Sequence, residues 1–135
     1  MTWSPGAVRA AFGDRLNSLV FSPAFPIVPD NIDDPGGTYK LETNVVFNQN
    51  NRFGIGIEHQ YTGFFQVTVV MPSGEGAVKA DNVAKAISDH FPVDLKLTAG
   101  EYVVRVTSTP DIAGGYDDDH SDWRVPVTVY FESWD

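Results

Sequence analysis

The chain of 135 residues contains no cysteine. Without thiols it can form no disulfide framework, no thiolate zinc or iron–sulfur site and no cysteine nucleophile, which suits a reducing compartment. A domain of this length buries roughly two-thirds of the surface that its unfolded chain exposes, so it needs no cross-link to fold. We therefore expect one domain over residues 1–135.

Basic residues are also few. Nine Lys and Arg stand against 18 Asp and Glu, which gives a net charge of −9. Because Lys and Arg supply most of the affinity for nucleic acid by displacing counterions from phosphates, this balance argues against specific nucleic-acid binding. From Pro110 to Asp135 there are seven carboxylates and one arginine, so six of the nine excess negative charges fall in the last 26 residues. We therefore expect most of the excess negative charge to lie in one local region of the surface.

Long apolar runs are missing as well. The longest apolar stretch, Val67 to Met71, is far too short to cross a bilayer, and the first residues lack the basic and apolar blocks of a signal peptide. The sequence predicts a soluble, unsecreted protein with no membrane contact.

Two segments have the spacing of amphipathic helices. Ser4 and Pro5 form a helix start, because serine can accept an orphan amide hydrogen and proline suits the first turn. The apolar residues that follow at three- and four-residue spacing are Val8, Ala11, Phe12, Leu16 and Leu19. A second helix is marked by Ala80, Val83, Ala84, Ile87 and Phe91, with Asp81 and Lys85 at i, i+4 and His90 near the negative end of its dipole.

Other segments alternate with the period of strands. A strand with one wet face begins at Tyr39, and Phe64 to Met71 is apolar enough to be central and covered on both faces. Further strands are expected over 102–107 and from Trp123 to Glu132, where Pro126 calls for an edge position or a bulge. The fold class is therefore α+β: a mixed, mostly antiparallel sheet packed with two helices, with a long projecting hairpin or loop.

The acidic stretch from Pro110 to Asp122 is expected to be a loop. It contains Asp117, Asp118, Asp119 and Asp122, but a calcium loop needs glycine and glutamate where Asp122 and Thr128 stand. Clustered aspartates usually form a solvated turn, and we predict no metal ion and no other cofactor.

The known catalytic patterns also fail. Residues 88–90 (Ser-Asp-His) and 120–122 (His-Ser-Asp) have the letters of a nucleophilic triad, but adjacent residues point in different directions. Gly54 and Gly56 are not followed by a third glycine at the dinucleotide spacing. We therefore predict a non-enzymatic protein without catalytic residues.

The excursion from Asn48 to Thr62 is the second candidate surface. Its apolar residues Phe53, Ile55 and Ile57 follow Arg52 on a projecting arm, where a small domain cannot bury them all. Association with a partner would cover them, whereas a hairpin folded back over the sheet remains an equal alternative.

The order and spacing of several segments resemble a known family. These are the N-terminal helix, the connection FPIVPDN at 25–31, the strand GFFQVTV at 63–69 running into PSGEG at 72–76, the helix ending at His90–Phe91, and WRVPVTV at 123–129. Over nearly the full chain this pattern is similar to the tail terminator proteins of long-tailed bacteriophages.

The resemblance implies a structural virion protein in the neck region of a phage or prophage tail, assembled in the cytoplasm of the bacterial host. It implies a closed ring, usually hexameric, that caps the tail tube and joins it to the head-side connector or stopper protein. The candidate lumen or docking loop is then Asp117, Asp118, Asp119 and Asp122, and the candidate subunit or tube interface is Arg52, Phe53, Ile55 and Ile57. Another neck or head-completion subunit is the alternative, followed by a metal-dependent hydrolase that uses the aspartates.

Overall fold

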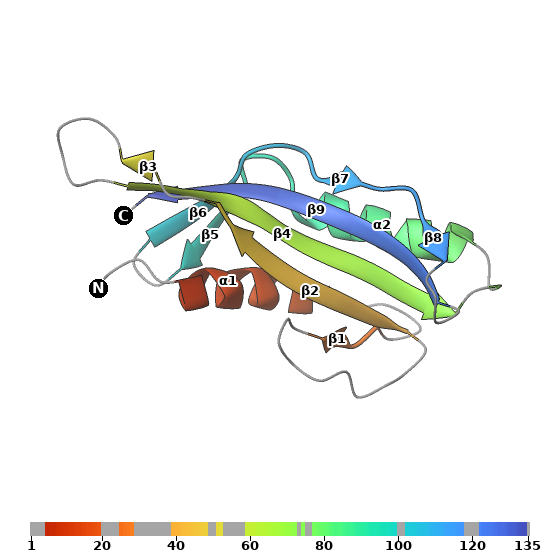
Figure 1. Cartoon of the computed structure of the whole chain (residues 1–135). Coiled ribbons are helices and arrows are strands. Elements are labelled where there is room, and N and C mark those ends of the chain that lie inside the picture. The colour runs from red at the N-terminus through yellow and green to blue at the C-terminus, as the bar shows by residue number, and fades with distance from the viewer. Residues whose placement is uncertain are drawn as a thin grey trace.

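The computed structural model describes residues 5–19, 25–28, 39–48, 51–52, 59–72, 74, 77–99, 102–117 and 122–134. Two helices lie on one face of a strongly curved sheet (Figure 1). The elements in chain order are α1 (Pro5–Asn17), β1 (Ile27–Val28), β2 (Lys40–Phe47), β3 (Asn51–Arg52), β4 (His59–Pro72), α2 (Ala77–His90), β5 (Lys96–Ala99), β6 (Tyr102–Val106), β7 (Asp111–Ile112), β8 (Tyr116–Asp117) and β9 (Asp122–Trp134).

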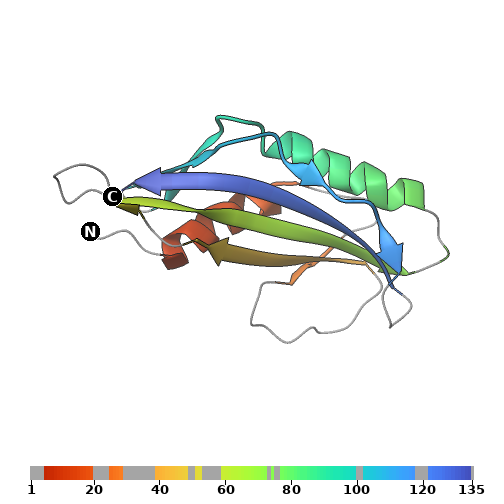
Figure 2. The ribbon, with the colours of Figure 1, turned by 45° about the horizontal axis from the view of Figure 1, so that its top comes forward.

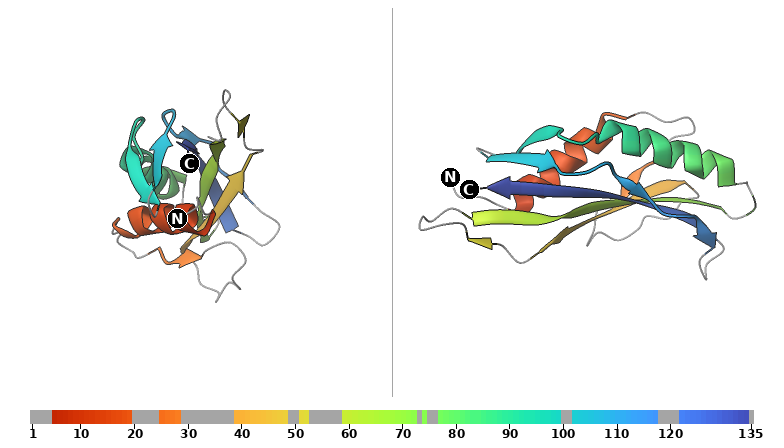
Figure 3. Two further views of the ribbon diagram at one scale, coloured as in Figure 1. Left: turned by 90° about the vertical axis from the view of Figure 1, so that its left-hand side faces the viewer. Right: turned by 90° about the horizontal axis from the view of Figure 1, so that it is seen from above.

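The sheet has the order β1-β2-β4-β9-β6-β5, and every pair is antiparallel except β1 with β2. The predicted α+β class with a mixed, mostly antiparallel sheet is therefore confirmed. Seen from its end, the sheet curls so that β5 and β6 face β2 and β4 across the helices (Figure 3). Among the described residues, no helix is long and apolar enough to cross a bilayer.

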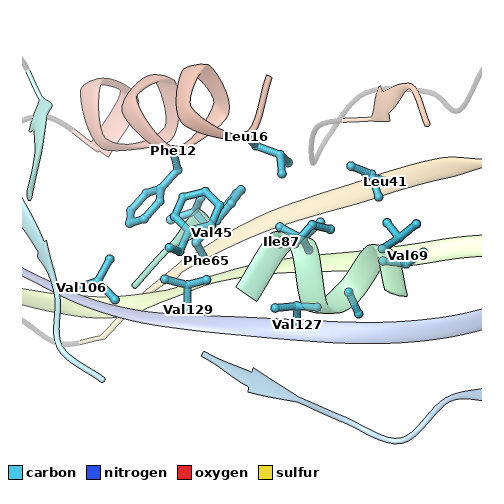
Figure 4. Close-up of a cluster of buried hydrophobic side chains, with 14 of the residues drawn as sticks. Phe12, Leu16, Leu41, Val45, Phe65, Val69, Ile87, Val106, Val127 and Val129 are labelled. Atoms are coloured by element: carbon cyan, nitrogen blue, oxygen red, sulfur yellow. The ribbon is translucent and has the colours of Figure 1, made fainter. Parts of the chain in front are cut away.

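Helix α1 inserts its apolar stripe into this curl. Val8 and Phe12 are fully buried and Leu16 is almost so. The Phe12 ring stacks on Phe65 of β4 at 4.9 Å and lies 5.1 Å from the Phe131 ring of β9, measured between centroids. Figure 4 shows Phe12 and Leu16 pointing from the helix toward Phe65 and Val129 on the strands. One aromatic side chain thus joins the first helix to both central strands.

The helix predicted from Ala80 to Phe91 is α2, which packs its buried side chains on β4 and β9. Its surface differs in one detail from the prediction. Lys85 pairs with Asp89 at 2.7 Å, one turn beyond it, and not with Asp81. This direction places the carboxylate in the last turn of the helix, and the pair is well exposed, so it contributes little to stability.

Strand β4 is central, as predicted, but it begins five residues before Phe64 and is covered by helices on one face only. Its inward residues Phe65, Val67, Val69 and Met71 are buried, whereas the outward side chains of Phe64, Gln66 and Thr68 are only half-buried. The prediction of two covered faces was wrong because both helices follow the same side of the sheet (Figure 3).

The described part of the expected acidic loop runs along an edge of the sheet. Residues 111–117, here called the edge segment, contain β7 and β8, which pair with β9 at Asp111↔Thr128 and Asp117↔Trp123. The segment continues β6 along the same side of β9, with extra residues between the paired runs (Figure 2). Apolar alternation in the sequence does not reveal such a segment, because its strands are two residues long and all its residues except Gly115 are exposed.

Strand β9 lies inside the sheet, so the edge position predicted from Pro126 is wrong for the strand as a whole. The proline itself faces the edge segment, because its carbonyl oxygen accepts the Ala113 amide at 3.0 Å. A strand residue directs its N–H and C=O to the same side, so the missing amide falls where β9 has only short partners.

Candidate functional site

The two candidate surfaces lie at opposite ends of the long central strands. At one end β3 pairs with the start of β4 at Arg52↔His59, and we call this the arm end. At the other, β4 finishes beside the start of β9 at Pro72↔Asp122, and we call this the acidic end (Figure 1). Strand β4 has 14 residues, so at ~3.3 Å per residue the two ends are about 40 Å apart along the strand.

The acidic end holds the described part of the predicted aspartate group. Asp117 is the exposed last residue of β8, and Asp122 is the half-buried first residue of β9. Asp118 and Asp119 lie between them in the chain and outside the described residues. Among the residues that the structure describes, no group of three His, Asp or Glu side chains could hold a metal ion.

At the arm end, the backbone of Arg52 belongs to β3, and Phe53, Ile55 and Ile57 lie outside the described residues. The projecting hairpin itself is present, since β3 pairs with β4 beyond the end of β2. Gly63 makes the base of this hairpin possible. A Cβ atom there would lie 2.1 Å from the carbonyl oxygen of Val46, so the two strands approach too closely for any side chain.

An ion network near the arm end was not predicted. The Arg105 guanidinium of β6 donates to Glu132 of β9 at 2.5 and 2.9 Å and also pairs with Asp94. The pKa of Arg105 is raised above its ordinary value, mainly by the hydrogen bonds to Glu132 and to a smaller extent by the hydrogen bond to Asp94. Three segments separated in sequence meet in this network, and no local pattern could have indicated it.

A second ion pair crosses the outward face of the sheet. Arg124 of β9 donates to both carboxylate oxygens of Glu42 on β2 at 3.0 Å, across the intervening strand β4. Val70 of β4 stands in register between Lys40 and Arg124 and is 1% exposed, so this outward residue is covered. Arg124, the only basic residue after Pro110 in the sequence, thus links β9 to Glu42 on β2.

The C-terminal ends of the two helices meet and cap each other. Arg15 Nε donates to the His90 carbonyl at 3.0 Å, and His90 Nε2 lies 2.9 Å from the Arg15 carbonyl and 2.7 Å from Ser18 Oγ. A carbonyl oxygen accepts only, so His90 carries its hydrogen on Nε2. Burial lowers the pKa of His90 below 6.5, the nearby Arg15 charge lowers it further, and the hydrogen bond to the Arg15 carbonyl opposes both. Helix α2 ends at His90, as predicted, but the His90 side chain caps the end of α1, and the end of α2 is capped by Arg15.

The edge segment also carries exposed apolar side chains that alternation did not indicate as surface. Ile112 is 41% and Tyr116 49% exposed. Gly115 lies against the Trp123 indole, where a Cβ atom would come within 2.4 Å of a ring carbon. The predicted docking region therefore combines acidic and apolar groups along one edge of β9.

A curved, mostly antiparallel sheet with both helices on one face defines an α+β domain. The family model described as "Phage tail terminator protein" matches residues 7–131. The chain therefore belongs to the phage tail terminator family, and it is a structural protein of a phage tail.

Solved structures that resemble the chain include two that cover 96% of it. One, a protein without a descriptive name, is 31% identical, with a TM-score of 0.81 over 96% of this chain and 95% of its own. The other belongs to the virion of a native gene transfer agent particle. It is 14% identical, with a TM-score of 0.71 over 96% of each chain, which shows a shared fold. No curated protein sequence matches the chain.

Proposed function

We propose that the protein caps the end of the tail tube and joins it to the head-side connector, as a closed ring of identical copies. Six copies are expected from the family. The observation that carries the proposal is family membership over nearly the whole chain. The long sheet adds physical support, because a joining piece needs two docking faces and this domain has two unlike ends about 40 Å apart along β4.

The acidic end suits the channel or a docking face close to it. Asp117 and Asp122 stand there, and the sequence between them adds Asp118 and Asp119 without a Lys or Arg. Carboxylates repel phosphate, so DNA can pass such a surface without being held. The protein then needs no specific nucleic-acid affinity in order to work next to DNA.

The arm end suits a protein interface. Arg52 begins the sequence RFGIGI at 52–57, whose apolar residues Phe53, Ile55 and Ile57 alternate with glycine. Apolar side chains on a projecting hairpin are covered most readily by a partner, here a neighbouring subunit or the tube protein. We therefore expect the protein in the neck of the virion, after assembly in the cytoplasm of the bacterial host.

The acidic end is tested by replacing Asp117, Asp118, Asp119 and Asp122 with asparagine. We expect unchanged folding but a loss of phage titre, because assembly or DNA passage fails. The control neutralises three exposed carboxylates elsewhere: Asp14, Asp81 and Asp89. Wild-type titre from the first variant contradicts the assignment of the acidic end.

The arm end is tested by Ile55→Asp, with Val78→Asp on the exposed side of α2 as the control. Electron microscopy of tails from the Ile55→Asp variant should show uncapped tubes of uncontrolled length. Tails of normal length that lack heads would favour the alternative, a head-completion or stopper subunit. Normal capping and ring formation would remove Ile55 from the interface.

A further inference from the structure

The two lateral edges of the sheet are unlike each other. On the side of β9, the edge segment exposes Ile112 and Tyr116 together with Asp111 and Asp117. On the opposite side lies β2, which β4 pairs along its full length. A ring made by rotation needs two different surfaces on opposite sides of each copy, and sheet edges supply such a pair.

Among the described strands, only β1 adjoins the second side of β2, and it does so over a short part of its length. Strand β1 pairs there only with Leu41 and Glu42, and from Thr43 to Phe47 no described strand adjoins that side. The Leu41 amide donates toward β1 and the Asn48 amide toward β4. Because strand residues alternate in this respect, the backbone groups of Thr43 and Val45 point to the open side.

Natural edges are usually protected by charges, prolines or bulges. The run from Thr43 to Phe47 contains no charged residue and no proline, and its pairing with β4 has no bulge. The edge strand β5, in contrast, is four residues long and exposes Lys96. An unprotected edge of this kind pairs readily with another strand. In a chain that works as a ring, the neighbouring copy is the natural partner.

The two edges also match in position along the strand direction, here called height. Thr43 pairs with Val67, Val67 with Val127, and Val127 with Ile112, so one row of residues runs straight across the sheet. Rotation about an axis along the strands does not change the height of a residue. Ile112 of one copy therefore arrives beside Thr43 of the next, and the two edges run antiparallel because β7 and β2 are three antiparallel pairings apart.

The charges of the two sides are complementary near the acidic end. Asp117 is in register with Trp123 and hence with Met71, the level at which Tyr39 precedes β2. On the β2 side, Lys79 places its ammonium 4.6 Å from the centroid of the Tyr39 ring. The contact of two copies brings this cation to the height of the neighbour's Asp117.

We propose that neighbouring copies meet edge to edge, with the edge segment 111–117 of one copy against the open side of β2 in the next and the strands parallel to the ring axis. The inference rests on the proposed ring and deepens it. In this arrangement the acidic end and the arm end become the two faces of the ring, one for each structure that it joins.

Cysteine cross-linking tests the contact without background, because the chain has no cysteine of its own. A variant with Thr43→Cys and Ile112→Cys should give a ladder of covalent multimers up to the closed ring, both as concentrated protein and in assembled tails. Paired positions across antiparallel strands lie within disulfide reach. The control variant carries Thr43→Cys and Lys85→Cys, the latter on the exposed face of α2. It should form no covalent multimers.

The single variants make the test specific for a head-to-tail contact. Neither Thr43→Cys nor Ile112→Cys alone should cross-link, and an equal mixture of the two should stop at dimers. Dimers from one single variant would indicate a two-fold contact and overturn the proposal, as would the absence of a ladder from the double variant in both preparations. Tails that lack the protein would instead contradict the proposed function. In that case, cross-linking of the concentrated protein still tests whether the two edges are in contact.

A charge exchange gives an independent result. Lys79→Asp and Asp117→Lys should each lower the cross-linked fraction of the double-cysteine variant about threefold at low salt, and the two together should restore it. Equal losses that add in the combined variant would mean that the two groups do not face each other.

Discussion

Strand β9 has two sides of opposite character. Toward β4 it pairs without interruption from Asp122 to Trp134. Toward the other side it meets three short runs in which the register slips, first by two residues between Val106↔Phe131 and Asp111↔Thr128, then by one before Tyr116↔Arg124. We infer that the continuous side of β9 stabilises the fold and that the broken side is available to bind partners.

The largest effect is expected in the core that packs on the inward face of the continuous β4–β9 pair. Phe12→Ala removes a fully buried ring that packs on Phe65, Phe91 and Phe131, and such truncations cost about 3–5 kcal/mol of unfolding free energy. Urea denaturation measures the loss. Phe64→Ala, on the half-buried outward face of β4, is the matched control and should cost clearly less. Equal losses would contradict the contrast between the two faces.

Glycine substitutions of opposite sign come next. Gly63→Ala puts a Cβ atom 2.1 Å from the Val46 carbonyl oxygen, so the strands must separate at a cost of about 1–3 kcal/mol. Gly13→Ala in α1 meets no atom within 4 Å and should gain about 0.5–1 kcal/mol through helix propensity. Thermal melting of both variants tests the pair, and a stabilised Gly63→Ala protein would refute the close approach.

The contrast also shows what the sequence could predict. Long elements with a clear period, such as α1, α2 and β9, were predicted because burial imposes apolar spacing on them. Strand β5 and the edge segment were missed, since short exposed strands need no apolar alternation and their pairing depends on β9. The aspartates were found from charge alone, but the position of Asp117 at the end opposite Arg52 follows from the register of distant strands.

A smaller effect concerns the C-terminal ends of the two helices that pack on the inward face of the β4–β9 pair. Because the pKa of His90 is lowered below 6.5 in the folded protein, the unfolded chain binds the proton more readily. The stability that neutral His90 contributes is therefore full above 6.5 and declines as the pH falls through the folded pKa. Melting temperatures of wild type and His90→Gln, compared between about pH 7.5 and about pH 5, should converge on the acidic side. A constant difference would assign the pH dependence to other groups.

The smallest effect on stability is expected on the broken side, and there it separates folding from assembly. Ile112→Asn alters a side chain that is 41% exposed on a two-residue strand, so the free energy of unfolding should stay within about 0.5 kcal/mol of wild type. Ring formation should nevertheless be weakened, because the same side chain lies beside Thr43 of the neighbouring copy in the proposed contact. Ile87→Asn, at a fully buried position of α2, is the converse control and should unfold the protein by leaving a buried amide without partners. If Ile112→Asn keeps both its stability and its rings, the broken side of β9 has no part in assembly.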